Sequence, residues 1–263
     1  MEVILNINNL KHSYNDENEI FNNLCMYIEK NSITAISGPN NSGKTTLLKL
    51  LSINKYNKRG TIILDAKDIV DYTKEEYDKQ VQAVFYNELF KEDKVIDELY
   101  IDQQVIDEDK TNFIIDNLNL NKILSKEINT LNKQDKYKIL LSKAILNSTN
   151  IILLDSIDTY FNSKELNNIY TFLRKCIAKY NLTFIITINN LVNSLDVDNL
   201  YIINNGSTLL YGNPLEVLQK DNIINKAGLD IPFMIDLSVK LRDYNLLNKI
   251  ELKKERLINE LWK

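Results

Sequence analysis

The chain has 263 residues, which fits one large domain or one domain with an appendage. Hydrophobic residues make up 44% and charged residues 26%, and no apolar run is long enough for a membrane-spanning helix. The 32 basic and 36 acidic residues give a net charge of -4, which argues against a nucleic-acid partner. One histidine and two cysteines (His12, Cys25, Cys176) exclude a His/Cys metal cage and a disulfide framework. The two thiols, and an N-terminus without signal-peptide features, lead us to expect a cytoplasmic protein.

In the first part of the chain, short apolar runs alternate with helical patterns, as is typical of an α/β fold. Three runs read as half-buried strands: residues 3–7, 24–28 and 61–64. Three continuous apolar runs predict neighbouring parallel strands that are buried on both faces: residues 33–37, 151–154 and 184–188. The stretch from about 93 to 146 is helical and charged, and it predicts a helical subdomain inserted into the α/β core.

Towards the C-terminus the pattern changes from strands to helices. Residues 200–203 and 209–211 flank an Asn-Gly pair, which predicts a hairpin. Asn213 and Pro214 have the form of a helix start, and the helical periodicity from there ends in an amphipathic stretch, 250–262. Glycine (6) and proline (3) are scarce while asparagine is abundant, so we expect asparagine to make many of the tight turns.

The most specific motif is a phosphate-binding loop. Its residues match G-x-x-x-x-G-K-[ST], directly after the predicted strand 33–37 and directly before a helical run that begins at Thr46: Gly38, Pro39, Asn40, Asn41, Ser42, Gly43, Lys44 and Thr45. The glycines allow the backbone N–H groups to point at phosphate oxygens, and the helix N-terminus favours negative charge. Lys44 would bridge the β- and γ-phosphates and Thr45 would hold Mg²⁺. The alternative is a chance strand-turn-helix match.

A carboxylate for the magnesium site is expected at the end of a neighbouring buried strand. Asp155 follows the apolar run 151–154 and meets that requirement. A residue that merely caps the strand is the alternative reading. The motifs together predict a site for a nucleotide and Mg²⁺.

With these motifs the sequence resembles an ATP-binding cassette (ABC) ATPase over about residues 2–217. Tyr14 stands where these proteins stack an aromatic ring on adenine, and the helical insertion is typical of them. The run Leu131-Asn132-Lys133-Gln134-Asp135 stands at the LSGGQ signature, so Asn132 and Lys133 are expected to face nucleotide. The resemblance implies a RecA-like P-loop core with an N-terminal antiparallel β subdomain and a helical subdomain at about 93–146.

The C-terminal segment, 218–263, resembles the helical extension of energy-coupling factor ATPases. The similarity lies in residues 226–233, Leu237, Leu241 and Arg242. Such proteins work as a pair of ATPase chains on a transmembrane coupling protein at the cytoplasmic face of the membrane. An ordinary helical appendage is the alternative, because periodicity alone is generic.

Several catalytic positions depart from the family pattern. Ser156 replaces the glutamate that polarises water, and serine cannot act as a general base near neutral pH. Asn189 replaces the switch histidine and cannot exchange a proton. The other departures are at the loop glutamine (Tyr86), the signature (Asn132, Lys133, Gln134) and the D-loop aspartate (Asn162). These positions predict a nucleotide binder with impaired hydrolysis.

Three functions fit the sequence to different degrees. The first is the energising subunit of an ABC import complex, which pairs with a second ABC ATPase as a homodimer or heterodimer. The second is a non-hydrolysing, ATP-gated scaffold paired with an active ATPase. The third is a P-loop kinase or GTPase, which the signature-region alignment disfavours. The resemblance also implies that Tyr86, with Phe85, Leu89 and Phe90 nearby, stands where ABC subunits dock the membrane protein's coupling helix. Either exposure or core packing fits Tyr86, Leu89 and Phe90, whereas we expect Phe85 to pack in the core.

Overall fold

The computed structural model describes residues 2–14, 19–53, 58–85, 89–101 and 106–262. An antiparallel sheet at the N-terminal end has the strand order β2-β1-β4-β5. Its strands are β1 (Val3–Ser13), β2 (Glu19–Glu29), β4 (Ile62–Leu64) and β5 (Lys67–Asp68). β1 and β2 are longer than predicted, because Asn9 adopts a left-handed φ of 49° where the register shifts, and pairing resumes after it.

A second sheet carries the order β10-β9-β3-β8-β7-β6. Its strands are β3 (Ile33–Ser37), β6 (Val81–Val84), β7 (Ile151–Leu154), β8 (Thr183–Thr187), β9 (Asn199–Asn204) and β10 (Ser207–Gly212). All are parallel except β10. Every residue of β3, β7 and β8 is buried, and the three are neighbours, which confirms the central strands expected from their apolar runs. Asn205 and Gly206 form the predicted hairpin turn with positive φ.

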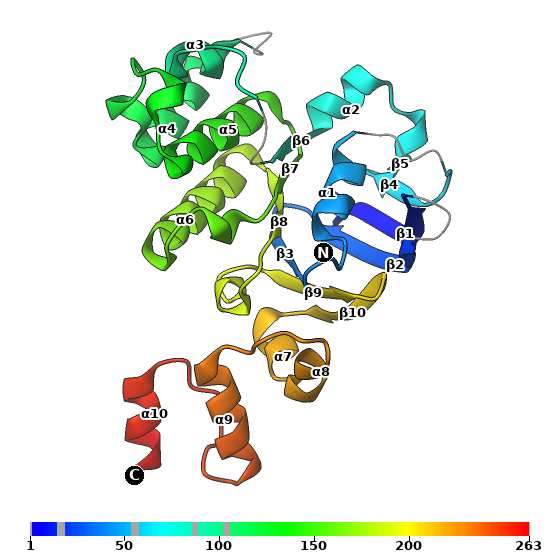
Figure 1. Ribbon diagram of the computed structural model, residues 1–263, viewed down its shortest axis with the longest axis vertical. Coiled ribbons are helices and arrows are strands. Elements are labelled where there is room, and N and C mark those ends of the chain that lie inside the picture. Colours follow the sequence, from blue (N-terminus) through cyan, green and yellow to red (C-terminus); the bar gives the residue numbers. More distant parts are fainter. Residues whose placement is uncertain (1, 15–18, 54–57, 86–88, 102–105, 263) are drawn as a thin grey trace.

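Two hydrophobic cores lie on opposite faces of the parallel sheet. Helix α1 (Lys44–Ser52) packs Leu47 and Leu51 in one core, between this sheet and the antiparallel sheet (Figure 1). α2 (Lys74–Gln80) joins it through Tyr77, whose hydroxyl donates to the Leu51 carbonyl. α6 (Ser163–Tyr180) packs in the core on the other face. Along β7, alternate residues enter alternate cores, because successive side chains of a strand point to opposite faces.

The predicted helical insertion is present as a group of helices beside the sheets (Figure 1). It contains α3 (Val95–Tyr100), α4 (Glu108–Leu118) and α5 (Lys133–Asn147). The fully buried Glu98 carboxylate accepts hydrogen bonds from Lys143 at 2.5 Å and from the backbone N–H groups of Lys91 and Glu92. These bonds connect the segment after β6 to α3 and to α5, the helix at whose start the signature is expected.

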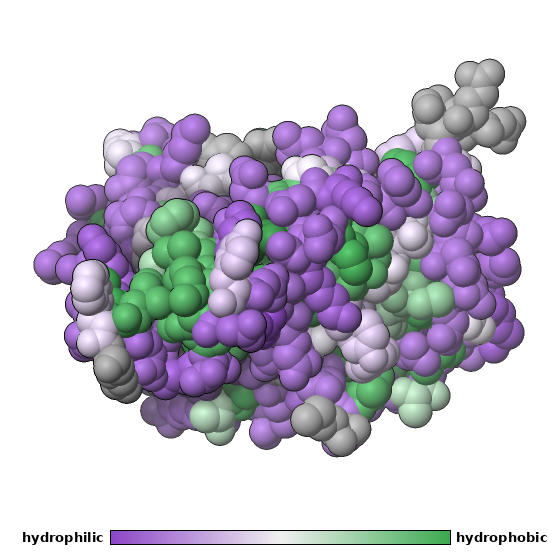
Figure 2. Space-filling view, turned by 90° about the horizontal axis from the view of Figure 1, so that it is seen from below, coloured by the Kyte–Doolittle hydropathy of each residue, from purple (hydrophilic) through white to green (hydrophobic). Residues whose placement is uncertain are grey.

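Four helices complete the chain at the end of the molecule farthest from α2 (Figure 1). They are α7 (Pro214–Leu218), α8 (Asp221–Lys226), α9 (Phe233–Asp243) and α10 (Lys254–Leu261). Ser238 Oγ donates to the Glu251 carbonyl and accepts from the Glu251 N–H, which fastens α9 to the segment before α10. Figure 2 shows this end, where hydrophobic surface is surrounded by hydrophilic surface. In the part of the chain that the structure describes, no helix has the length and apolar character to cross a membrane.

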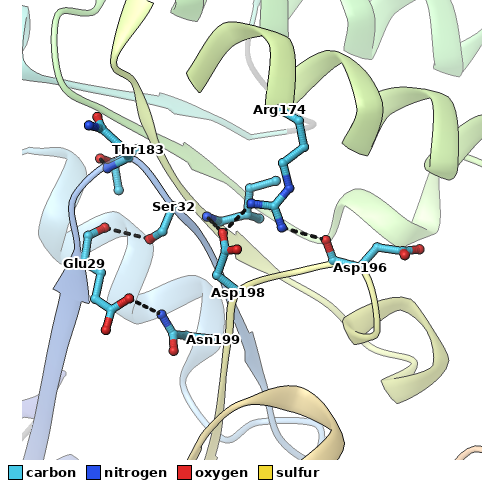
Figure 3. Close-up of polar contacts among 9 residues, drawn as sticks. Glu29, Ser32, Arg174, Thr183, Asp196, Asp198 and Asn199 are labelled. Carbon is cyan, nitrogen blue, oxygen red and sulfur yellow. Dashed lines mark hydrogen bonds and ion pairs between the residues drawn. The ribbon is translucent and has the colours of Figure 1, made fainter. Parts of the chain in front are cut away.

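Polar contacts fix the amino ends of the parallel strands (Figure 3). Asp198 accepts from the Ile33 N–H at 2.7 Å and from Arg174 at 2.5 Å, and Arg174 also donates to the Asp196 carbonyl. Asn199 donates to Glu29 nearby. This network joins α6, β9 and the β2–β3 turn at one edge of the sheet. The carboxyl ends of the same strands lie at the opposite end of the sheet, and ligands of open α/β sheets bind at the carboxyl ends of the strands.

Candidate nucleotide-binding site

The phosphate-binding loop connects the carboxyl end of β3 to α1. Asn41 and Gly43 have φ values of 64° and 94°, and Gly43 is the N-cap of α1. Gly38 is required by close packing, because a Cβ there would collide with the Ile203 carbonyl and lie 2.6 Å from Ser42 Oγ. The sequence therefore folds into a tight loop at the N-terminus of a helix, which is a favourable place for an anion.

A cleft of about 650 Å³ opens beside this loop. Among the residues that the structure describes, its lining consists of Tyr14, Ile20, Asn40, Asn41, Ser42, Gly43, Lys44, Thr45, Thr46, Ser156 and Asn189. The structure thus brings together most of the nucleotide-site residues predicted from the sequence. Gly38, Pro39 and Asp155 are not in the lining but contact residues that are.

Lys44 is buried, and its ammonium group donates to the carbonyl oxygens of Gly38 at 2.8 Å and Pro39 at 3.1 Å. Burial lowers the pKa of Lys44, and the carboxylates of Asp155 and Asp158 partly oppose that shift. The ammonium is therefore held against the inside of its own loop, with negative charge nearby.

Asp155 lies at the carboxyl end of β7, and its carboxylate accepts hydrogen bonds from hydroxyl groups on α1 and β8. Thr45 Oγ1 donates to its two carboxylate oxygens at 3.1 and 3.0 Å, and Thr187 Oγ1 donates to Oδ1 at 2.7 Å. The Ser156 N–H donates in turn to Thr187 Oγ1 at 2.7 Å. A carboxylate and a hydroxyl at the start of α1 thus meet in the arrangement that Mg²⁺-phosphate sites use.

The two cleft residues expected at catalytic positions, Ser156 and Asn189, come from the loops after β7 and β8. Ser156 adopts a left-handed φ of 49°. Asn189 is exposed, and its amide nitrogen lies 3.5 Å from Asp158 Oδ1 and 3.3 Å from Thr159 Oγ1. Neither side chain carries a carboxylate or an imidazole, so the two supply no general base to the cleft.

Tyr14 lines the cleft and is 61% exposed. Its hydroxyl is 3.3 Å from Thr46 Oγ1, and its ring makes an edge contact with His12 at a centroid distance of 5.2 Å. An exposed, edge-supported ring beside a phosphate-binding loop can stack on a flat base.

The loop fits a phosphate group by one further observation. Ser42 is buried, and its Oγ atom has no hydrogen-bond partner among the described residues. Buried polar atoms are normally satisfied, so this hydroxyl is suited to a ligand oxygen at the loop. Together with the Thr45–Asp155 contact, it makes the residues present compatible with a nucleotide and Mg²⁺.

Other predicted residues lie outside this cleft. Asn132 caps α5 by accepting from the Asp135 N–H, and Lys133 is the first residue of that helix; neither lines the cleft. Tyr86 falls outside the described residues. Of its neighbours, Phe85 and Phe90 pack against the cores, whereas Leu89 is 91% exposed.

Sequence reasoning missed three residues that shape the site, namely Ile20, Thr187 and Asp158. Thr187 is the last residue of β8, so the rule that sites lie at the carboxyl ends of parallel strands could have found it. Ile20 lines the cleft from β2. Asp158 follows Asp155 closely in the chain and could have been noticed as a second carboxylate near the phosphate site.

The comparisons agree with this geometry. The chain belongs to the ABC transporter family, whose model matches residues 21–158. One relative, the energy-coupling factor transporter ATP-binding protein EcfA1 of Mycoplasmopsis synoviae, is 24% identical over 89% of this chain and 92% of its own. EcfA of Pediococcus pentosaceus is also 24% identical, over 100% of this chain and 97% of its own.

Solved structures show the same fold. The structure of cbiO1 from Clostridium perfringens, described as part of the ABC transporter complex cbiONQ, has a TM-score of 0.73 at 22% identity, over 90% of this chain and 99% of its own. A bacterial Atm1-family ABC exporter with ATP bound also has a TM-score of 0.73, at 16% identity over 86% of this chain and 41% of its own. The expected ABC ATPase fold is thereby confirmed.

Proposed function

We propose that this chain is the ATP-binding, energising subunit of an energy-coupling factor type import complex. It would bind Mg²⁺-ATP in the cleft beside the phosphate-binding loop and close as a dimer against a transmembrane coupling protein at the cytoplasmic face of the membrane. The observation that carries the proposal is the convergence of Lys44, Thr45 and Asp155 at that cleft. The names of the relatives support the type of transporter.

In this proposal each group has a separate task. The backbone N–H groups at the start of α1 and the Lys44 ammonium hold the phosphates, and the Tyr14 ring covers the base. Mg²⁺ would be held by Thr45 and Asp155 and would supply positive charge to the phosphate oxygens. Lys44 would exchange the Gly38 and Pro39 carbonyl oxygens for phosphate oxygens.

Calorimetry of the purified chain with Mg²⁺-ATP tests the proposal. We expect saturable binding that Lys44→Ala weakens strongly, because it removes the buried ammonium. Lys49→Ala is the matched control, since Lys49 lies on the same helix but is exposed and does not line the cleft. Absence of binding to the wild type, or equal binding to Lys44→Ala, would contradict the proposal.

We further propose that the chain hydrolyses ATP slowly, because Ser156 and Asn189 supply no general base. A general base contributes on the order of 10² to 10⁴ in rate. Ser156→Glu should therefore raise turnover by about 10²-fold, and Ser156→Gln, which adds similar bulk and similar backbone strain without a base, should not. Fast turnover by the wild type that Lys44→Ala abolishes would show that another residue acts as the base.

The residues at the expected signature, Asn132 and Lys133, bear on how the two nucleotide sites of a dimer would differ. Asn132 and Lys133 do not line this chain's cleft, and we propose that they face a nucleotide held by a partner ATPase that has an intact base. In that complex the partner's P-loop lysine is indispensable for transport, Lys44 mainly supports assembly, and Lys133→Ala lowers ATPase activity. Equal loss of ATPase activity from both P-loop lysine variants, with unaltered assembly, would refute this arrangement.

The second candidate is a non-hydrolysing, ATP-gated scaffold paired with an active ATPase. The presence of Ser156 in the cleft favours it, because the chain then holds ATP without turnover. Steady ATPase activity of the isolated chain eliminates this candidate, and copurification with a membrane protein supports the first.

A further inference from the structure

Asp158 lies beside the nucleotide cleft and accepts several N–H groups from one segment. Its Oδ2 atom accepts from the backbone N–H groups of Asn189 at 2.9 Å and Asn190 at 2.8 Å, and from Asn193 Nδ2 at 3.1 Å. Asp158 follows β7 and these asparagines follow β8, and the two strands are parallel neighbours. One carboxylate therefore joins the two loops that border the cleft.

The hydrogen bonds of Asn189 differ between its backbone and its side chain. The backbone bond to Asp158 is short, whereas the side-chain amide lies at 3.3 Å from Thr159 Oγ1 and 3.5 Å from Asp158 Oδ1. Hydrogen bonds weaken at such distances. The backbone of Asn189 is thus fixed, while its exposed amide can turn to a ligand in the cleft that it lines.

We propose that Asp158 is a positioning residue that holds the Asn189 amide for the terminal phosphate of a nucleoside triphosphate, and so sets this chain's preference for ATP over ADP. The inference rests on the proposed binding of ATP. A hydrogen bond from the Asn189 amide to the terminal phosphate can form only with the triphosphate. Loss of the Asp158 carboxylate should therefore weaken the binding of ATP more than the binding of ADP. A hydrogen bond to a charged group corresponds to about tenfold or more in affinity.

Calorimetry with Mg²⁺-ATP and Mg²⁺-ADP tests the proposal through the ratio of the two dissociation constants. Asn189→Ala and Asp158→Ala should each reduce the preference for ATP about tenfold, and the double variant should reduce it no further. Asp158→Asn keeps an acceptor for the backbone N–H groups and should retain the preference. Asn193→Ala is the matched control, because it removes an Asp158 contact without touching the Asn189 backbone.

Amide hydrogen exchange supplies a second measurement. The Asn189 and Asn190 N–H groups should be protected in the wild type and in Asp158→Asn, and should exchange at least tenfold faster in Asp158→Ala. If Asp158→Ala does not fold, Asp158→Ser, whose shorter side chain cannot reach both N–H groups, replaces it.

The outcomes separate this inference from the proposed function. If the wild type binds neither nucleotide, the proposed function fails and takes the inference with it. If the wild type binds ATP but Asp158→Ala or Asn189→Ala leaves the ratio unchanged, the inference alone is overturned. An equal loss of the preference for ATP in Asn193→Ala would also overturn the inference, because that loss would then result from general loosening of the loop after β8.

Discussion

Replacing Gly43 by alanine should destabilise the phosphate-binding loop in two ways. A residue with a Cβ is strained at a positive φ, and the Cβ itself would collide with neighbouring side chains. Gly43 has a φ of 94°, and an added Cβ would lie 2.7 Å from Phe21 Cζ and 2.8 Å from Ile20 Cγ2. Gly60 is a matched control, because its φ is 80° and an added Cβ would meet no atom within 4 Å. Both variants place alanine at a positive φ, and only Gly43→Ala also brings a Cβ into close contact with Phe21 and Ile20.

The magnitudes follow from these two geometries. A left-handed conformation costs an L-residue about 1 to 2 kcal/mol, and overpacking a core costs about 1 to 3 kcal/mol more. Phe21 is completely buried, so its ring cannot move aside into solvent. We expect Gly60→Ala to lower the free energy of unfolding by about 1 kcal/mol and Gly43→Ala by about 2 to 5 kcal/mol. Any change in unfolded-chain entropy is common to both and cancels in the difference.

Urea denaturation with and without Mg²⁺-ATP measures both effects. At a ligand concentration of about 100 times the dissociation constant, the wild type and Gly60→Ala should gain about 2.7 kcal/mol. Gly43→Ala should gain less, because displacement of the loop moves the N–H groups at the start of α1. Equal destabilisation of the two variants would refute the role of the Phe21 contact, and equal gains from nucleotide would refute the role of the loop geometry.

Two further predictions concern buried groups away from the cleft. Lys143→Met should lower the free energy of unfolding by about 3 to 5 kcal/mol in urea denaturation, because it leaves the buried Glu98 carboxylate without its ion-pair partner; a loss below 1 kcal/mol would contradict this. Burial raises the pKa of Cys176 to about 12, so at pH 8 its thiol stays protonated, whereas Cys25 is exposed. Ellman's reagent should therefore titrate one thiol per native chain and two in denaturant, and two fast thiols in the native chain would contradict the buried position.

The turns and central strands could be predicted because they depend on local chemistry. Of the ten non-glycine residues with positive φ in the described parts of the chain, seven are asparagine, as the scarcity of glycine led us to expect. The short helix α2 was not predicted, although Thr73 and Glu76 form a capping box that is a readable start signal. At the C-terminus, α10 begins at Lys254 and not near residue 250, because the backbone of Glu251 is bonded to Ser238 on α9.

In the candidate site, too, the residues in local motifs could be predicted, whereas contacts between distant segments could not. The loop and Asp155 were found from the motif and from the strand that precedes each. The contacts of Asp158 with Asn189 and Asn190 join residues 31 and 32 positions apart, and only the parallel pairing of β7 with β8 brings them together. The position of Thr187 between Asp155 and Ser156 depends on the same pairing. Pattern reasoning has no access to such contacts until the strand order is known.

The hydrogen bonds around Asp155 explain how binding and hydrolysis can be separated in one chain. Asp155 is held by the hydroxyl groups of Thr45 and Thr187, and Thr187 also accepts the Ser156 N–H. This network uses the backbone of residue 156 and not its side chain, so a serine there leaves the carboxylate in place. A serine at position 156 therefore places no carboxylate there and leaves undisturbed the groups proposed to hold Mg²⁺. The proposed division of labour, in which this chain closes on nucleotide and a partner hydrolyses it, therefore requires no change in the groups proposed to hold Mg²⁺.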